Sequence, residues 1–372
     1  IAILICALGA MSESLFYTAL APLLTHLDDR FDFGHEQAGL LVAGYALGYW
    51  LGAYPAYRLA ARIGPRATAT AGVACVAVAT LGFAVGGGYP MLMGSRLLVG
   101  VGSVIAYTGL LAAAGEIAGV DRRGAAIGTV YSGSAAGSAV GPLVGSLAAE
   151  FGRAPVFGMV AIGQALVAAL LSRLPTVPNA DEAPMRVMRG YLTSSQVRIG
   201  LWITAVPGFA LGVLTLSGSY RLDELGAGSA LIALAFSGIA VINVFVAPRI
   251  GAASDRMGRR RPLMLALVVA AVAVLLIIAA GREVPAIVLI AIAGAFLLTI
   301  AGPGLALVGD GIRAQGGDPS HATFLMNMAW GPAAALGAIS AGFVHGSFGA
   351  NASLVMLVAI AAVSLVLVRR GA

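Results

Sequence analysis

The chain has 372 residues, of which 59% are hydrophobic and only 10% are charged. Its mean hydropathy of +0.95 excludes an ordinary soluble domain, since such domains carry about 25% charged residues. All of the positive charge is arginine, because the chain contains no lysine, and the net charge is +6. In so apolar a chain this excess indicates membrane orientation and not nucleic-acid binding. Cys6 and Cys75 lie in apolar runs and predict neither a disulfide framework nor a metal site.

Twelve apolar stretches are long enough to cross a membrane as helices, since a bilayer core about 30 Å thick needs roughly 20 apolar residues. They lie at approximately 2–26, 37–58, 67–86, 89–114, 125–149, 154–173, 198–219, 227–249, 263–280, 285–308, 321–345 and 350–368. We find no small-residue cleavage site and therefore expect the chain to begin inside its first helix, without a cleaved signal peptide. The sequence predicts an all-α membrane protein with twelve transmembrane helices.

One long loop, rich in proline and charge, divides the chain. We expect an N-terminal six-helix bundle at 1–173, a cytoplasmic central loop at 174–197 and a C-terminal six-helix bundle at 198–372. Loops on one side of the membrane hold seventeen arginines, whereas those on the other side hold four. Because cytoplasmic loops carry the excess of basic residues, both termini and the central loop are predicted to be cytoplasmic.

The two halves repeat a short pattern after their second spans. Arg62, Gly64 and Arg66 correspond to Arg256, Gly258 and Arg260, each 194 residues later. Six spans are an even number, so the halves have the same topology and form two pseudo-symmetric bundles around one central path.

The fifth span carries glycine every four residues, at Gly133, Gly137, Gly141 and Gly145, and this set is called the glycine face below. Steps of four advance a helix by about 400°, so these glycines share one side, where another backbone can approach closely. Pro142 adds a kink. A helix of this composition is tolerated in lipid, where the backbone must stay internally bonded.

The strongest motif is the loop GAASDRMGRRRP between spans eight and nine. It resembles the loop signature of the major facilitator superfamily at six positions: Gly251, Asp255, Arg256, Gly258, Arg259 and Arg260. The alternative is a simple turn with arginines that orient the chain.

Two further motifs resemble signatures of the drug/proton antiporter branch of that family. In span five the antiporter pattern matches at Gly137, Gly141, Pro142 and Gly145, with Ser146 in place of the last glycine. Span four carries a pattern around Arg96 and Gly100 that departs from its signature at Val99, where glutamine is usual. The glycine face could instead be only a packing seam.

The resemblance implies a gating latch built from the loop signature. By pseudo-symmetry, Asp255, with Arg256, Gly258 and Arg259, is expected to lie against the cytoplasmic start of span five. Arg122 and Arg123 sit there, and the helix dipole is positive. In the N-terminal copy of the loop the corresponding aspartate is replaced by Ala61, so the latch is predicted to work from one half only.

Only Glu13 and Arg96 lie deep in apolar runs. An ionisable group costs at least about 2.5 to 3.5 kcal/mol at the bilayer centre and is normally kept for function. Glu13 lies near the expected midplane and is our candidate for the proton-carrying residue, with Arg96 as its partner. Alternatively, Glu13 is a structural acid and Arg96 extends to the outer interface. Glu116 and Asp310 are poorer candidates for the proton carrier.

Aromatic and sulfur side chains gather at a similar depth and predict a pocket for a partly apolar solute. The candidate contacts are Phe16, Tyr17, Tyr45, Tyr49, Trp50, Tyr107, Met326 and Trp330. Each of them could instead serve only in packing.

We find no nucleotide-binding loop, nucleophile arrangement or cofactor motif, which disfavours an ATP-driven pump or a membrane enzyme. The resemblance implies a monomeric secondary transporter of the bacterial cytoplasmic membrane that exports a small organic compound against protons by alternating access. An uptake symporter or uniporter of the same fold, and a non-transporting receptor or scaffold, are the alternatives.

Overall fold

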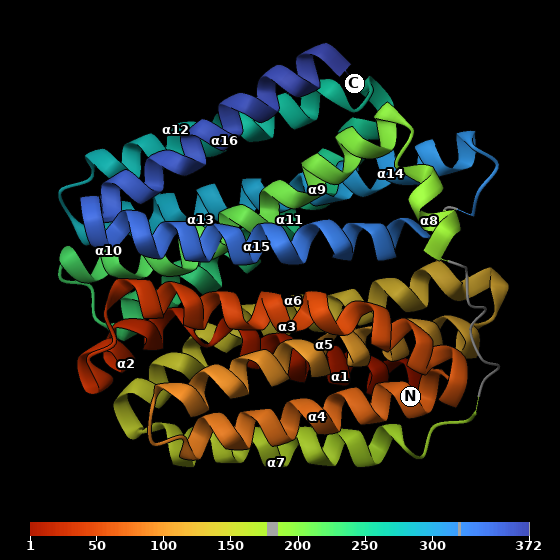
Figure 1. The fold of residues 1–372 in the computed structure, drawn as a ribbon, viewed down its shortest axis with the longest axis horizontal. Helices are drawn as coiled ribbons and strands as arrows, with labels where there is room; N and C mark the ends of the chain where they lie inside the picture. Colours follow the sequence, from red (N-terminus) through yellow and green to blue (C-terminus); the bar gives the residue numbers. More distant parts are fainter. Residues whose placement is uncertain (177–184, 319–320, 372) are drawn as a thin grey trace. The chain divides into compact units, whose positions relative to one another are not determined.

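The computed structural model describes residues 1–176, 185–318 and 321–371, and these ranges are helical apart from short connections (Figure 1). The residues divide into two compact units, one made of Ile1–Phe33 and Gly44–Glu182 and the other of Gly34–Ala43 and Ala183–Ala372. The middle of the expected central loop, 177–184, lies outside the described residues.

The first unit contains most of α3 together with six further helices. Their bounds are α1 Ala2–Thr18, α2 Leu24–Phe31, α3 Gly34–Ile63, α4 Pro65–Val85, α5 Tyr89–Ala118, α6 Arg123–Phe151 and α7 Arg153–Leu171. The second unit contains the start of α3 and the remaining helices. These are α8 Met185–Tyr191, α9 Ser195–Val213, α10 Ser219–Glu224, α11 Ser229–Met257, α12 Arg260–Ala279, α13 Glu283–Thr299, α14 Ala301–Ala314, α15 His321–Phe348 and α16 Ala350–Gly371.

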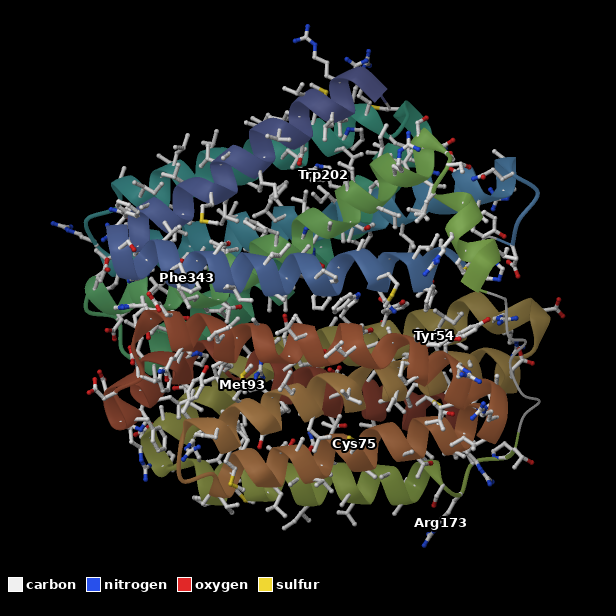
Figure 2. All side chains as sticks on the ribbon, viewed as in Figure 1. Tyr54, Cys75, Met93, Arg173, Trp202 and Phe343 are labelled. Atoms are coloured by element: carbon white, nitrogen blue, oxygen red, sulfur yellow. The ribbon has the colours of Figure 1, made fainter. Side chains whose placement is uncertain are left out.

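Twelve helical segments match the predicted spans. Ten of them, within the described ranges, are long and apolar enough to cross a membrane by length and composition. The other two are α3 and α6, with 30 and 29 residues, whose hydropathy is lowered by their charged, polar and glycine residues. Large apolar side chains are partly exposed, among them Phe343, 50% exposed, and Trp202, 37% exposed, which are labelled in Figure 2. An apolar outer surface of this kind suits contact with lipid.

Three spans that the hydropathy pattern predicts as continuous are interrupted. The first, expected at 2–26, breaks after Thr18, where a short 3-10 turn, Ala21–Leu23, leads into α2. A π-helical turn, Leu214–Gly218, joins α9 to α10. The span expected at 285–308 breaks at Ile300, between α13 and α14. Pro303 lies just after this break and has no backbone N–H to continue the helical hydrogen bonds. Asn243 of α11 braces the break, because its amide donates to the Ala295 carbonyl and to Thr299 Oγ1, both at 3.0 Å.

The repeat in the sequence has a counterpart in the backbone. Gly64 ends α3 with φ +82° and ψ 161°, and Gly258 ends α11 with φ +81° and ψ 157°. Positive φ favours glycine, so the same residue terminates the same helix in each half. Pro142 does not end a helix, because α6 continues through it as one α-helix from Arg123 to Phe151.

Candidate functional site

Glu13 is buried in the first unit, with only 2% of its surface exposed. Its two carboxyl oxygens have different partners. The Tyr45 hydroxyl donates to Oε1 at 2.7 Å, and the Ser14 hydroxyl donates to Oε2 at 3.0 Å. A buried carboxyl is stable only when such partners replace water, so α1 and α3 together hold this acid in place.

Aromatic rings and one guanidinium lie on the Oε1 side of the carboxyl. The rings of Tyr17 and Tyr45 stack with their centroids 4.0 Å apart. The Arg96 guanidinium lies 5.5 Å from the Tyr45 centroid and 5.9 Å from the Tyr17 centroid, within the range of cation–π attraction. Arg96 is 1% exposed and therefore stays among these rings instead of extending toward solvent. Tyr45 contacts both charged residues, through its hydroxyl and its ring.

Hydroxyl groups lie on the Oε2 side. Ser14 Oγ is 2.7 Å from Ser134 Oγ of α6 and 3.3 Å from the Tyr107 hydroxyl of α5. We call Ser14, Ser134 and Tyr107 the hydroxyl chain. Ser14 is buried, whereas Ser134 and Tyr107 are half-buried. Of the three, only Tyr107 is a candidate from the sequence; the two serines were missed because serine is common in membrane helices.

The glycine face of α6 positions the Glu13 helix. A Cβ at Gly133, Gly137 or Gly141 would collide with the backbone carbonyl of an α1 residue, and a Cβ at Gly145 would collide with that of Ala19, directly after α1. The partners are Ala7, Met11, Leu15 and Ala19, which repeat with the same spacing of four as the glycines. The two backbones thus pack against each other without intervening side chains, as close helix pairs in membranes do.

A second close approach positions Tyr45. A Cβ at Gly100 of α5 would collide with the Tyr45 carbonyl and the Tyr49 backbone nitrogen of α3. Gly48 of α3 meets the Leu97 carbonyl of α5 in the same way. Arg96 directly precedes Leu97, so this contact between α5 and α3 places Arg96 at the same height as Tyr45 on the neighbouring helix. The span-four motif therefore supplies Arg96 as a cation and, through Gly100, also allows α5 to pack closely against α3.

The other aromatic candidates in the first unit lie in different surroundings. Tyr49 is buried, with its ring centroid 6.0 Å from that of Tyr45. Phe16 packs edge-on against Phe83 and Phe157, at 5.4 and 5.2 Å between centroids, in an apolar cluster of α1, α4 and α7. Trp50 is 39% exposed.

The two candidates in the second unit, Met326 and Trp330, are half-buried on α15. Trp330 lies at the contact between α15 and α9, where a Cβ at Gly208 would meet its carbonyl and its ring. Met326 and Trp330 belong to a different unit from Glu13. A single pocket lined by these two residues and by the tyrosines near Glu13 therefore stays a prediction.

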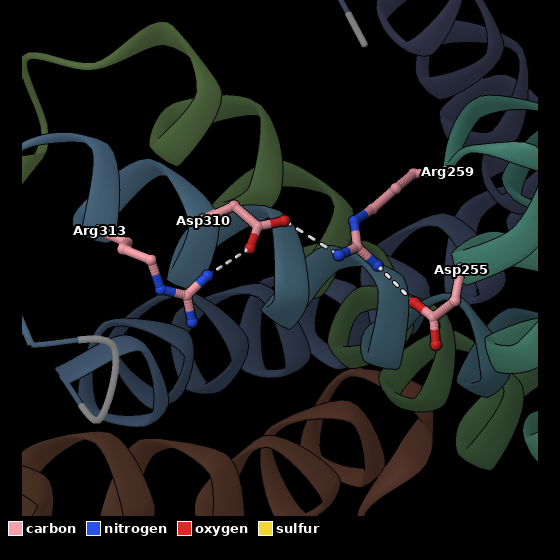
Figure 3. Close-up of polar contacts among 4 residues, drawn as sticks. All are labelled: Asp255, Arg259, Asp310 and Arg313. Carbon is pink, nitrogen blue, oxygen red and sulfur yellow. Dashed lines mark hydrogen bonds and ion pairs between the residues drawn. The ribbon is translucent and has the colours of Figure 1, made fainter.

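The loop signature forms an ion-pair network within the second unit (Figure 3). Arg259 pairs with Asp255 at 3.3 Å and with Asp310 of α14 at 2.9 Å, and Arg313 pairs with Asp310 at 3.1 Å. Arg256 is exposed, and Gly258 supplies the positive φ that turns the chain. The network ties the loop between α11 and α12 to the end of α14.

The corresponding region of the first unit is built differently. Glu116, at the position equivalent to Asp310, pairs with Arg123 at 3.6 Å, while Arg122 is exposed. Ala61 and Pro65 stand where the second unit has Asp255 and Arg259, so the same network cannot form there. The expected contact between Asp255 and the start of span five joins different units and stays a prediction.

Solved structures share this fold. A bacterial homolog of the human lysosomal transporter Spinster, in an inward-facing and occupied conformation, superposes with a TM-score of 0.83 at 16% identity, covering 99% of this chain and 96% of that one. The same homolog, inward-facing and unoccupied, gives 0.82 at 15% identity, with 99% and 95% covered. A D-xylose–proton symporter gives 0.74 at 16% identity, with 99% and 96% covered.

No curated protein matches the sequence. The sequence does match the family description "Major Facilitator Superfamily" over residues 6–316, which is most of the chain. Together with the helical architecture and the solved relatives, this match shows that the chain belongs to the major facilitator superfamily of membrane transporters.

Proposed function

We propose that this transporter couples the export of a small, partly apolar organic compound to proton entry, with Glu13 as the proton-carrying residue. The observation that carries the proposal is the buried Glu13 carboxyl, which bonds to Tyr45 and Ser14 beside the rings that hold Arg96. A membrane-embedded acid with a cation close by marks an ion pathway more often than a packing site.

The arrangement supports two protonation states. As a carboxylate, Glu13 accepts hydrogen bonds from Tyr45 and Ser14, and the nearby Arg96 offsets its charge. As a neutral acid, it loses that attraction but no longer carries a charge in an apolar site. A cationic solute entering beside it favours the carboxylate and expels the proton. Proton and solute then exclude each other, which couples their movements.

Tyrosine rings are the proposed solute contacts nearest the acid, namely Tyr17, Tyr45, Tyr49 and Tyr107. They present flat apolar faces with polar edges, which suit an aromatic or cationic compound. The ring of Phe16 packs against Phe83 and Phe157, and we assign this residue to packing. Trp50, Met326 and Trp330 remain proposed contacts from the alternating-access scheme, in which both halves line the path.

We also propose that Asp255 latches the cytoplasmic side, held by Arg259 and supported by Arg256 and Gly258. The ion pairs with Asp310 support this role because they fix the loop on α14. Arg122 and Arg123 are the proposed surface on which the latch closes. We place the protein as a monomer in a bacterial cytoplasmic membrane with both termini inside.

The proposal is tested in proteoliposomes carrying an imposed pH difference, with the membrane potential clamped. An antiporter drives ethidium, a flat lipophilic cation, into the acidic compartment. A proton symporter would drive it into the alkaline one, which would contradict export. Glu13→Gln should abolish the pH-driven movement, whereas Glu116→Gln, which removes a half-exposed carboxyl, should retain it. Full pH-driven accumulation by Glu13→Gln would show that another group carries the proton.

A further inference from the structure

The hydroxyl chain beside Glu13 links the buried acid to more exposed groups. Ser14 Oγ bonds to Glu13 Oε2 at 3.0 Å and to Ser134 Oγ at 2.7 Å. The link to the Tyr107 hydroxyl is longer, at 3.3 Å, so Ser134 is the stronger partner. Glu13 and Ser14 are 2% and 4% exposed, while Ser134 and Tyr107 are half-buried.

The donors on this path have a defined direction. Ser14 has one proton and gives it to Glu13 Oε2, so its oxygen can only accept from Ser134 or Tyr107. Tyr45 donates to the other oxygen, Oε1. A proton that travels along the hydroxyl chain therefore reaches the carboxylate at Oε2, the oxygen to which Ser14 donates.

From this geometry we infer that Ser14 is the proton relay of Glu13, with Ser134 as the group that exchanges protons with water in the transport path. The inference rests on the proposed role of Glu13 as the proton carrier. In one transfer, a hydronium ion gives a proton to Ser134, which passes its own to Ser14, and Ser14 passes its own to Glu13. Each hydroxyl gains one proton and loses one, and release reverses the order.

Packing supports this assignment independently of the hydrogen bonds. Ser134 lies on α6 between Gly133 and Gly137, both of which face the α1 backbone. Without a Cβ on these neighbours, α6 approaches α1 closely enough for two short serine side chains to meet. Longer side chains would otherwise be needed to span two helices, which normally lie 8–10 Å apart.

The test follows protonation of Glu13 itself and needs no transported compound. In purified protein, a light-released proton lowers the pH, and infrared spectroscopy follows the carboxyl C=O band that Glu13→Gln removes. Ser134→Ala leaves the Ser14–Glu13 bond in place but interrupts the chain. It should slow the rise of the band at least about tenfold without moving the pH at which the band is half-formed.

Two further variants complete the design. Ser14→Ala should slow the rise as well, and Ser14→Thr, which restores a hydroxyl, should recover it. Ser12→Ala is the matched control, since Ser12 lies on the same helix and its hydroxyl bonds only to the Gly9 carbonyl among the described residues. Wild-type rates in both Ser14→Ala and Ser134→Ala would overturn the relay. A protein whose spectrum contains no Glu13 band between pH 4 and 10 would instead overturn the role of Glu13.

Discussion

Tyr45 and Glu13 are joined by a hydrogen bond of 2.7 Å between the tyrosine hydroxyl and Oε1, formed across α3 and α1. The ring of the same tyrosine lies 5.5 Å from the Arg96 guanidinium. One side chain thus contacts the acid and the cation of the proposed coupling site. Its hydroxyl and its ring can be separated by mutation, because phenylalanine keeps the ring alone.

Tyr45→Phe should shift the pH dependence of transport. The variant removes a hydrogen bond to the carboxylate, worth about 1.5 to 3 kcal/mol for a charged acceptor, and so favours the neutral acid. The half-maximal point of the transport profile should move to higher pH by about one unit or more. Tyr54→Phe is the control, because Tyr54 lies on the same helix but is 40% exposed. An unchanged profile in Tyr45→Phe would remove this bond from the coupling mechanism.

Gly141→Leu should abolish transport and lower thermal stability. Its side chain would collide with the Leu15 carbonyl and Thr18 of α1, and overpacking of this kind costs about 1 to 3 kcal/mol or more. Val140→Leu, at a neighbouring position that is 38% exposed, should be mild. The measurements are the melting temperature in detergent and ethidium transport in proteoliposomes. Similar values for the two variants would contradict close packing at the glycine face.

Asp255→Asn should make the cytoplasmic side more accessible. The change removes one charge from the pair with Arg259, in which Asp255 is 74% exposed, so about 1 kcal/mol or less is involved. That is enough to shift the populations of two states of similar energy severalfold. Alkylation rates of cysteines engineered along the cytoplasmic half of the path, with Cys6 and Cys75 replaced, report the shift.

The control for this prediction is Asp29→Asn, an exposed acid on α2. The proposed latch would be refuted by equal labelling in wild type and Asp255→Asn. A second variant, Asp310→Asn, should have the larger effect, because the Arg259–Asp310 pair is shorter and less exposed than the Arg259–Asp255 pair.

Hydropathy predicts the helices of this protein well because lipid leaves the backbone few alternatives to a continuous helix. The span expected at 89–114, for example, is α5, Tyr89–Ala118. The interruptions at Ala21–Leu23, Leu214–Gly218 and Ile300 were not predicted, because mean hydropathy over a window does not register a local break in the helical hydrogen bonds. Gly302 and Pro303 were the available signal for the interruption at Ile300.

The candidate site is only partly predictable for a geometric reason. Sequence position gives the depth of Glu13 and Arg96 in the membrane but not the neighbouring helix that each one faces. Phe16 and Tyr17 both follow Glu13 by about one turn, yet consecutive residues point about 100° apart on a helix. Tyr17 therefore stacks on Tyr45, while Phe16 turns into the phenylalanine cluster. Ser14 and Ser134 can be recognised as hydrogen-bond partners only when the packing of α1 against α6 is known.

The seam between α1 and α6 repeats every four residues on both helices, so its packing alone does not fix how far one helix is shifted along the other. A slide of one turn, about 5.4 Å, would place each glycine opposite the next carbonyl with nearly the same fit. The hydroxyl side chains keep the same spacing, because Ser138 follows Ser134 by four residues on α6 and Thr18 follows Ser14 by four on α1. A slide of one turn would therefore place another hydroxyl opposite Ser14 or Ser134. The contacts that fix the register of these two helices must lie outside their shared seam.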